Sequence, residues 1–332
     1  MRAHRKKNAC KRFLSLRLIS ARAHCNAQNS QSLKWESDSI SSGDFRMLDI
    51  EKKFLNGRCD QHIHSGPDSY FGIYASRAWA KPSTSIRLLD NIEAAMEARE
   101  AGIRAILLKC TSICTVDRAY SAHKLVPEVE VFGEINMNET IGGLNATAIQ
   151  RTVKMKPNLL RMVMLPANES DPKRKDILVT MKDGQPLPET VEVLKAIAEH
   201  DLILGCPAKA AMVKAAKSVG VKKISLQHPE YLHVTGKFDL EKEMVSLGAY
   251  LELCLNSCMP PNPRMTYEEY ANIVKAIGAQ HCVLVSDMGQ IYNPTPVQGL
   301  RMLIVNILQQ GISDEDIDIM TKKNPAYLLG LE

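Results

Sequence analysis

From residue 47 onward, the sequence alternates short apolar, β-rich runs with longer amphipathic stretches. Residues 105–108, for example, are all apolar, as in parallel strands that are buried on both faces. Eight such strand–helix units in about 270 residues predict a (β/α)8 TIM barrel, a fold of typically about 250 residues. The predicted strands are 58–63, 103–108, 129–133, 160–165, 201–205, 222–227, 248–253 and 282–286, and the predicted helices lie near 84–101, 115–125, 144–155, 187–199, 207–219, 238–246, 266–278 and 295–310.

Glycines at the predicted helix ends support the barrel. Gly102, Gly220 and Gly278 each stand between a predicted helix and the next strand, where glycine allows the turn that ends a helix. A doubly wound open sheet is the alternative fold. It is disfavoured because no G-x-G-x-x-G or Walker-type phosphate loop follows any strand.

Charge separates the first residues from the rest of the chain. Residues 1–35 hold nine Lys/Arg and no acid, so the remainder carries 33 basic against 37 acidic residues. We therefore interpret 1–46 as a basic leader that is either disordered or similar to an organellar transit peptide. Alternatively, the gene model begins too early and Met47 is the functional start. Residues 47–332 are then the barrel domain, which we expect to be cytoplasmic, or mitochondrial if the leader is a genuine transit peptide.

Composition excludes several classes of protein. Outside the leader the chain is mildly acidic and has no cluster of basic residues that would indicate nucleic-acid binding. No run approaches the 18 or more apolar residues of a membrane span. Nine cysteines without zinc-like spacing indicate reduced thiols in an intracellular protein. We expect a small-molecule substrate. A homo-oligomer is possible because the aromatic-rich 65–83 loop suits either a lid or a subunit contact.

The candidate site lies at the strand ends, because TIM barrels carry their chemistry at the C-terminal ends of the strands. His62 and His64 end the first run, and side chains two residues apart on a strand share a face, so both can bind one metal ion. Asp287 ends the last run as a candidate ligand or general base, and His228 ends the sixth as a ligand or proton carrier. Asp60, one step deeper than His62, could orient its ring. The structural alternatives are a buried histidine pair and an Asp that caps the next turn.

Lys109 ends the second run and has several possible roles. Its ammonium could bind an anionic substrate, a carbamylated lysine could bridge two metals, and a structural salt bridge with Glu134 or Asp287 is equally compatible with the sequence. Cys206 and Cys254 are small, semi-apolar barrel residues by default.

Six blocks in order along the chain resemble a little-characterised family of amidohydrolase-related proteins. The resemblance implies a metal-dependent hydrolase-type barrel with a first-strand H-x-H, histidines after strands five and six, and an Asp after strand eight. This chain departs from that pattern at Cys206, where a histidine is expected, and no lysine ends the fourth run. Cys206 could serve instead as a soft ligand. The blocks are 60–67, 101–109, 141–145, 227–230, 285–290 and 324–331.

The sequence therefore predicts one divalent ion, zinc, with manganese or iron as alternatives, held by His62, His64, Asp287 and His228. Asp287, His228 and Lys109 are the predicted catalytic residues of a hydrolase that acts on an amide, lactam or lactone carbonyl carbon. The same site could decarboxylate or hydrate a substrate. A catalytically inactive barrel that binds a small molecule or a partner is the alternative from another class, and a phosphoesterase is a weaker one.

Overall fold

The computed structural model describes residues 54–68, 87–166, 178–207, 209–231, 236–260 and 263–331. The predictions for the 1–46 leader and for nearly all of the 65–83 loop fall outside these ranges. Within them, no helix has the length and apolar character needed to cross a membrane.

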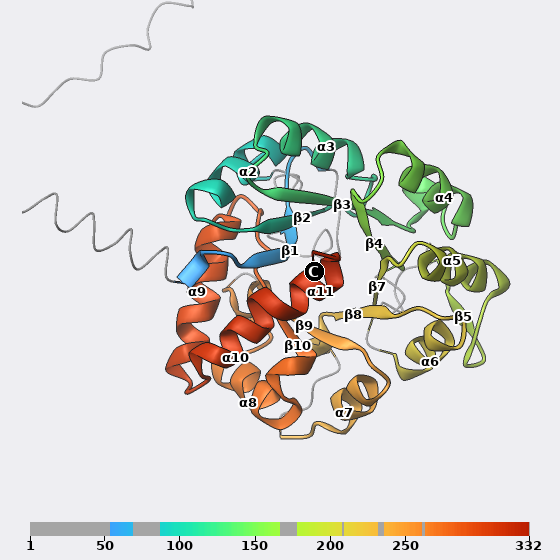
Figure 1. Cartoon of the computed structure of the whole chain (residues 1–332). Helices are drawn as coiled ribbons and strands as arrows, with labels where there is room; N and C mark the ends of the chain where they lie inside the picture. Colours follow the sequence, from blue (N-terminus) through green and yellow to red (C-terminus); the bar gives the residue numbers. More distant parts are fainter. Residues whose placement is uncertain are drawn as a thin grey trace, which may run out of the picture. The chain divides into compact units, whose positions relative to one another are not determined.

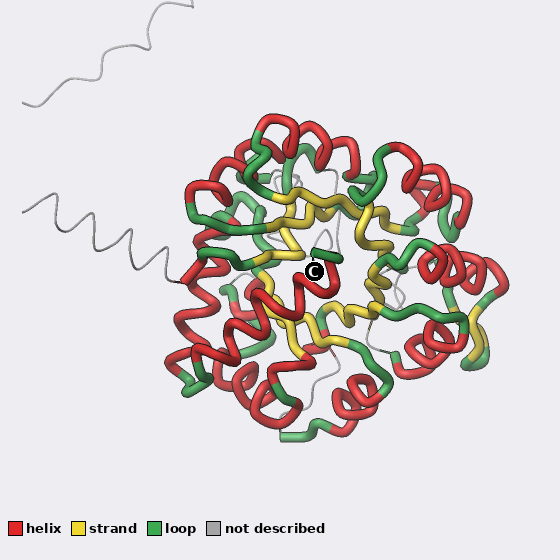
Figure 2. The backbone as a smooth tube through the Cα atoms, viewed as in Figure 1, coloured by secondary structure: helices red, strands yellow, loops and turns green. Residues whose placement is uncertain are grey.

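Eight parallel strands form one sheet in the order β1-β2-β3-β4-β7-β8-β9-β10. Seen along the axis they make a ring, with helices around its outside (Figures 1 and 2). All eight predicted strands are present with ends within three residues of the prediction, which confirms the (β/α)8 barrel. The strands are Cys59–His64 (β1), Ala105–Lys109 (β2), Glu130–Asn136 (β3), Leu160–Met164 (β4), Ile203–Pro207 (β7), Lys223–Gln227 (β8), Tyr250–Cys254 (β9) and Cys282–Val285 (β10). The surrounding helices are Asn91–Glu100 (α2), Val116–Leu125 (α3), Ala146–Met155 (α4), Pro188–Glu199 (α5), Ala210–Ser218 (α6), Asp239–Ser246 (α7), Tyr267–Ile277 (α8) and Pro296–Gln309 (α9).

Helix α2 begins later than the sequence pattern predicted. Asp90 is its N-cap and forms a capping box with Glu93, which sets the first helical residue at Asn91. Just before it, Leu88 and Leu89 form a bend, and Arg87 makes an isolated antiparallel bridge with Gln290, in the loop that follows β10. This segment therefore pairs with that loop and is not part of the helix.

The barrel closes through backbone hydrogen bonds between β1 and the segment after β10, a junction that we call the seam. The His64 amide donates to the Met288 carbonyl at 2.8 Å, and the Asp287 amide donates to the His62 carbonyl at 2.9 Å. Both bonds involve predicted site residues. Closure of the ring therefore fixes the backbone on which the candidate site is built.

The chain ends in helices that the sequence pattern did not predict. Asp314–Asp318 (α10), a π-helical turn at Ile319–Lys323 (η8) and Asn324–Leu329 (α11) follow α9, and α11 lies across one end of the ring (Figure 1). Leu328 and Leu329 are buried with the side chains that fill the barrel interior. Arg104, which precedes β2, donates to the Leu331 carbonyl at 2.6 Å. The C-terminus thus covers the end where strands begin, opposite the mouth, our name for the end where they finish.

Leu329→Ala is expected to lower the free energy of unfolding by about 2–5 kcal/mol, because it removes a fully buried side chain and leaves a cavity. Urea denaturation measures this loss. Leu240→Ala on α7 is the control, since that side chain is half exposed. Equal effects of the two substitutions would contradict the packing role of α11.

Candidate metal centre

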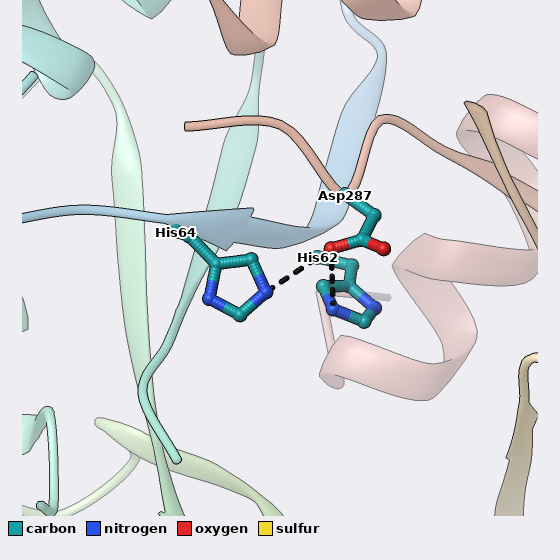
Figure 3. Close-up of side chains that lie close together, drawn as sticks. All are labelled: His62, His64 and Asp287. Atoms are coloured by element: carbon teal, nitrogen blue, oxygen red, sulfur yellow. Dashed lines mark ion pairs between the residues drawn. The ribbon is translucent and has the colours of Figure 1, made fainter. Parts of the chain in front are cut away.

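The two histidines of β1 point toward Asp287 at the mouth. Between them, Ile63 packs into the outer layer between strands and helices, so both imidazoles face the other side of the strand. Asp287 Oδ1 lies 3.3 Å from His62 Nε2 and 3.0 Å from His64 Nε2, as Figure 3 shows. The structure therefore brings together residues from the first and last strands, as the sequence predicted.

His228 joins this group from the position directly after β8. Its Nε2 lies 3.7 Å from Asp287 Oδ2, and its ring centroid is 5.7 Å from that of His62. His228 and Asp287 both have left-handed backbone, with φ of 51° and 52°. Non-glycine residues adopt this conformation at an energetic cost, and such residues concentrate at functional sites. Both of these residues carry their side chains into the mouth.

A buried carboxylate fixes the ring of His62. Glu252 Oε1 lies 2.6 Å from His62 Nδ1, while Oε2 accepts hydrogen bonds from Gln61 Nε2 and Ser225 Oγ, each at 2.8 Å. Burial opposes charge on both partners, but Asp287 and Glu252 raise the pKa of His62 to about 10, and His62 lowers the pKa of Glu252 to about 2. The metal-free pair is therefore an ion pair that aims Nε2 at Asp287.

Sequence reasoning gave Glu252 no role. The available signal was an acid placed between two leucines in the middle of a buried strand, because such a charge needs a partner. The partner, His62, is 190 residues away in the chain. Only the closed barrel brings the two together.

His228 has a similar carboxylate partner at Nδ1, whereas Nδ1 of His64 has no hydrogen-bond partner in the part of the chain that the structure describes. Glu230 Oε1 lies 2.9 Å from His228 Nδ1 and also accepts from Ser257 Oγ. Burial would lower the pKa of His228, but the Glu230 charge raises it. Burial, and then the charge of Arg87, lower the pKa of His64 to about 4, so this imidazole is neutral. His62 is therefore the cationic ring that faces Asp287, and the charge of Glu230 favours the protonated form of His228.

Asp287 is ionised despite its burial. Desolvation would raise its pKa, but the neighbouring imidazoles, His62 first, hold it well below the usual range. Asn256 Nδ2 also donates to Oδ2 at 3.0 Å. The carboxylate is thus charged and available to bind a cation.

Lys109 pairs with Glu134 rather than with Asp287. Its Nζ lies 2.6 Å from Glu134 Oε2, and both side chains are buried. The other oxygen of Glu134 accepts from the Cys110 amide at 2.9 Å. Of the two predicted salt bridges of Lys109, the one with Glu134 is present.

The suggested roles of Asp60 in orienting His62 and of Cys206 as a soft ligand were wrong, whereas the default expectation that Cys206 is a semi-apolar barrel residue is confirmed. The Asp60 carboxylate accepts from the backbone amides of His62 and Ser286, each at 3.2 Å, and does not orient the His62 ring. The alternation of side chains along β1 predicted which face of the strand Asp60 occupies, but not which groups it would contact. Cys206 packs in the outer layer between strands and helices, so its thiol faces away from the mouth and is no candidate ligand.

The residues at the mouth fit a divalent ion. Ligand atoms of His62, His64 and Asp287 all lie within 4.8 Å of one another. Two imidazoles and a carboxylate are a donor set used by catalytic zinc sites, which keep a further position for water or substrate. His228 approaches the same carboxylate and can add a fourth donor.

The barrel resembles solved structures of an amidohydrolase, a lactonase and a decarboxylase, with little sequence identity. An amidohydrolase from Burkholderia multivorans with bound zinc has a TM-score of 0.56 at 11% identity, over 82% of this chain and 99% of that one. The lactonase of Listeria monocytogenes has a TM-score of 0.53 at 12% identity, over 83% of this chain and 95% of that one. A 2,6-dihydroxybenzoate decarboxylase from Rhizobium has a TM-score of 0.50 at 12% identity, over 83% and 99%. The fold is thus that of amidohydrolase-type TIM barrels.

No curated protein matches the chain in sequence. A family profile does match, over residues 57–252, a range that runs from the start of β1 through Glu252 on β9 and includes His62, His64 and His228. The chain therefore belongs to the family of unknown function DUF6282.

Proposed function

We propose that this protein is a metal-dependent hydrolase that attacks the carbonyl carbon of an amide, lactam or lactone in a small molecule. The observation that carries the proposal is the convergence of three imidazole Nε2 atoms on the Asp287 carboxylate, at 3.3, 3.0 and 3.7 Å. The zinc-containing amidohydrolase and the lactonase with this fold support it.

His62, His64 and Asp287 are the proposed ligands of one divalent ion, zinc, with manganese or iron as alternatives. Bound there, the ion would supply a Lewis acid that brings the pKa of a water molecule toward about 7. Asp287 accepts the proton that this water loses as it attacks. Glu252 keeps the His62 ring in place during the reaction, since it holds Nδ1 at 2.6 Å.

Two further side chains complete the proposed reaction. His228, whose Nδ1 is held by Glu230, passes a proton to the leaving group or serves as a fourth ligand. Lys109, whose ammonium is held by Glu134, stabilises the negative charge that develops on the carbonyl oxygen. Decarboxylation is the second candidate function, favoured by the fold that the chain shares with the Rhizobium decarboxylase.

Elemental analysis tests the proposal on protein purified without added metal or chelator. We expect at least one equivalent of metal in the wild type and the loss of one equivalent in His62→Ala/His64→Ala, because two of the three proposed ligands disappear. The matched control is His200→Ala/His281→Ala, which alters two histidines away from the mouth and should retain the metal. A panel of lactones, amides and aromatic carboxylic acids then separates hydrolysis from decarboxylation. A wild type that binds no metal even after reconstitution would leave a barrel that only binds small molecules or partners.

A further inference from the structure

A buried thiol lies beside both histidine–carboxylate pairs. Cys254 is the last residue of β9, and its side chain is among those that fill the barrel interior. Its sulfur is within 4.8 Å of ligand atoms in His228 and Glu230, and likewise within 4.8 Å of ligand atoms in His62 and Glu252. A thiol among imidazoles and carboxylates is a typical environment of a metal ligand.

The two carboxylates differ in their capacity to take an ion. Both oxygens of Glu252 are engaged, one by His62 and the other by Gln61 and Ser225. Among the described residues, Glu230 Oε2 is buried without a hydrogen-bond partner, and the Glu230 side chain is 0% exposed. A buried carboxylate oxygen without a partner costs free energy, which a cation would offset. Of the two carboxylates, Glu230 is therefore the one with an oxygen available to bind a cation.

The resulting set differs from the three proposed ligands of the first ion, and it uses Nδ1 of His228, whereas Nε2 of the same ring faces Asp287. His62, His64 and Asp287 form one group, and His228, Glu230 and Cys254 form another, with no residue in common. The His228 side chain is 22% exposed, so an ion can reach this group from the mouth. We propose that His228, through Nδ1, together with Glu230 and Cys254, forms a second metal site beside the first.

The donor chemistry defines the ion. One sulfur, one nitrogen and one carboxylate oxygen select zinc, cobalt or cadmium over magnesium or calcium. On binding, the S–H bond of Cys254 is replaced by a sulfur–metal bond and the proton goes to solvent. The Nδ1 proton that His228 shares with Glu230 leaves in the same way. The inference rests on the proposed function in one respect, that the mouth takes up divalent metal.

Cobalt titration of metal-stripped, full-length protein tests the site, because thiolate ligation gives cobalt a charge-transfer absorption in the near ultraviolet. We expect two equivalents in the wild type, one of which produces this band. Cys254→Ser should lose the band and one equivalent, and Glu230→Gln should weaken the band-forming equivalent. Cys206→Ser is the control, because that buried thiol faces the outer layer and should leave both equivalents intact.

His62→Ala/His64→Ala separates the two proposals. If it loses one equivalent and keeps the band, both stand. If it loses one equivalent and no protein shows a thiolate band, the second site is refuted and the proposed function survives. If the wild type shows the band and the double variant binds as much cobalt, the proposed function fails and the thiolate site stands. A band that persists in Cys254→Ser also refutes the second site.

Discussion

Asp287→Asn is expected to lower turnover by about 10²–10⁴-fold, the range of a lost general base. The substitution keeps the shape of the side chain and removes the charge on which His62, His64 and His228 converge. It also removes an anionic ligand, so the metal content of the purified variant should fall. Steady-state kinetics on whichever substrate the panel identifies, together with elemental analysis, measure both effects.

The control for this variant is Asp201→Asn. That aspartate pairs with Lys223 near the opposite end of the barrel, and its side chain is about half exposed, so its loss should leave turnover unchanged. Full activity and full metal content in Asp287→Asn would exclude this carboxylate as ligand and as base. Full metal content with lost turnover would leave it the role of base alone.

Glu252→Ala is expected to lower the free energy of unfolding of the metal-free protein by about 3–5 kcal/mol, as when one partner of a buried ion pair is removed. Three buried donors, on His62, Gln61 and Ser225, lose their acceptor. Glu252→Gln keeps the volume and should weaken metal binding by about 10–100-fold, because His62 is no longer fixed by a charge. Urea denaturation and metal titration measure the two effects.

The destabilisation should depend on pH with a definite sign. The pKa of His62 is raised from 6.5 to about 10, so its part of the stabilisation is complete below 6.5 and is lost as pH rises through about 10. The pKa of Glu252 is lowered from 4.5 to about 2, so its part is complete above 4.5 and is lost as pH falls through about 2. The gap between wild type and Glu252→Ala is therefore widest between about 4.5 and 6.5. A gap that does not change with pH would show that the pair is not ionic.

The strands, and the residues that end them, could be predicted because their signals are local. An apolar run that stops at a polar residue is visible in a few neighbouring positions, and His62, His64, His228 and Asp287 were all found in this way. Barrel topology then required the first and last strands to be neighbours, which joined Asp287 to the two histidines.

The partners of these residues could not be predicted, because they depend on pairings between distant strands. Asp60 and Glu252 both lie near His62, and sequence periodicity favoured Asp60, the closer one along the chain. In the barrel, Asp60 bonds to backbone amides at the seam, and Glu252, from β9, holds the ring. The wrong choice arose because alternation along a strand gives the face of a side chain but not what lies opposite.

The seam has a consequence for how the protein is made. Asp60 and Ser286, which bond across it, are 226 residues apart in the chain. During synthesis, His62 and His64 leave the ribosome early. Asp287 follows β10, so the three residues come together only after β10 has emerged and paired with β1. Because domains acquire their long-range contacts only when the chain that makes them is available, the proposed site of His62, His64 and Asp287 is completed late in synthesis. A chain cut short before β10 keeps the two histidines but lacks the carboxylate of this site.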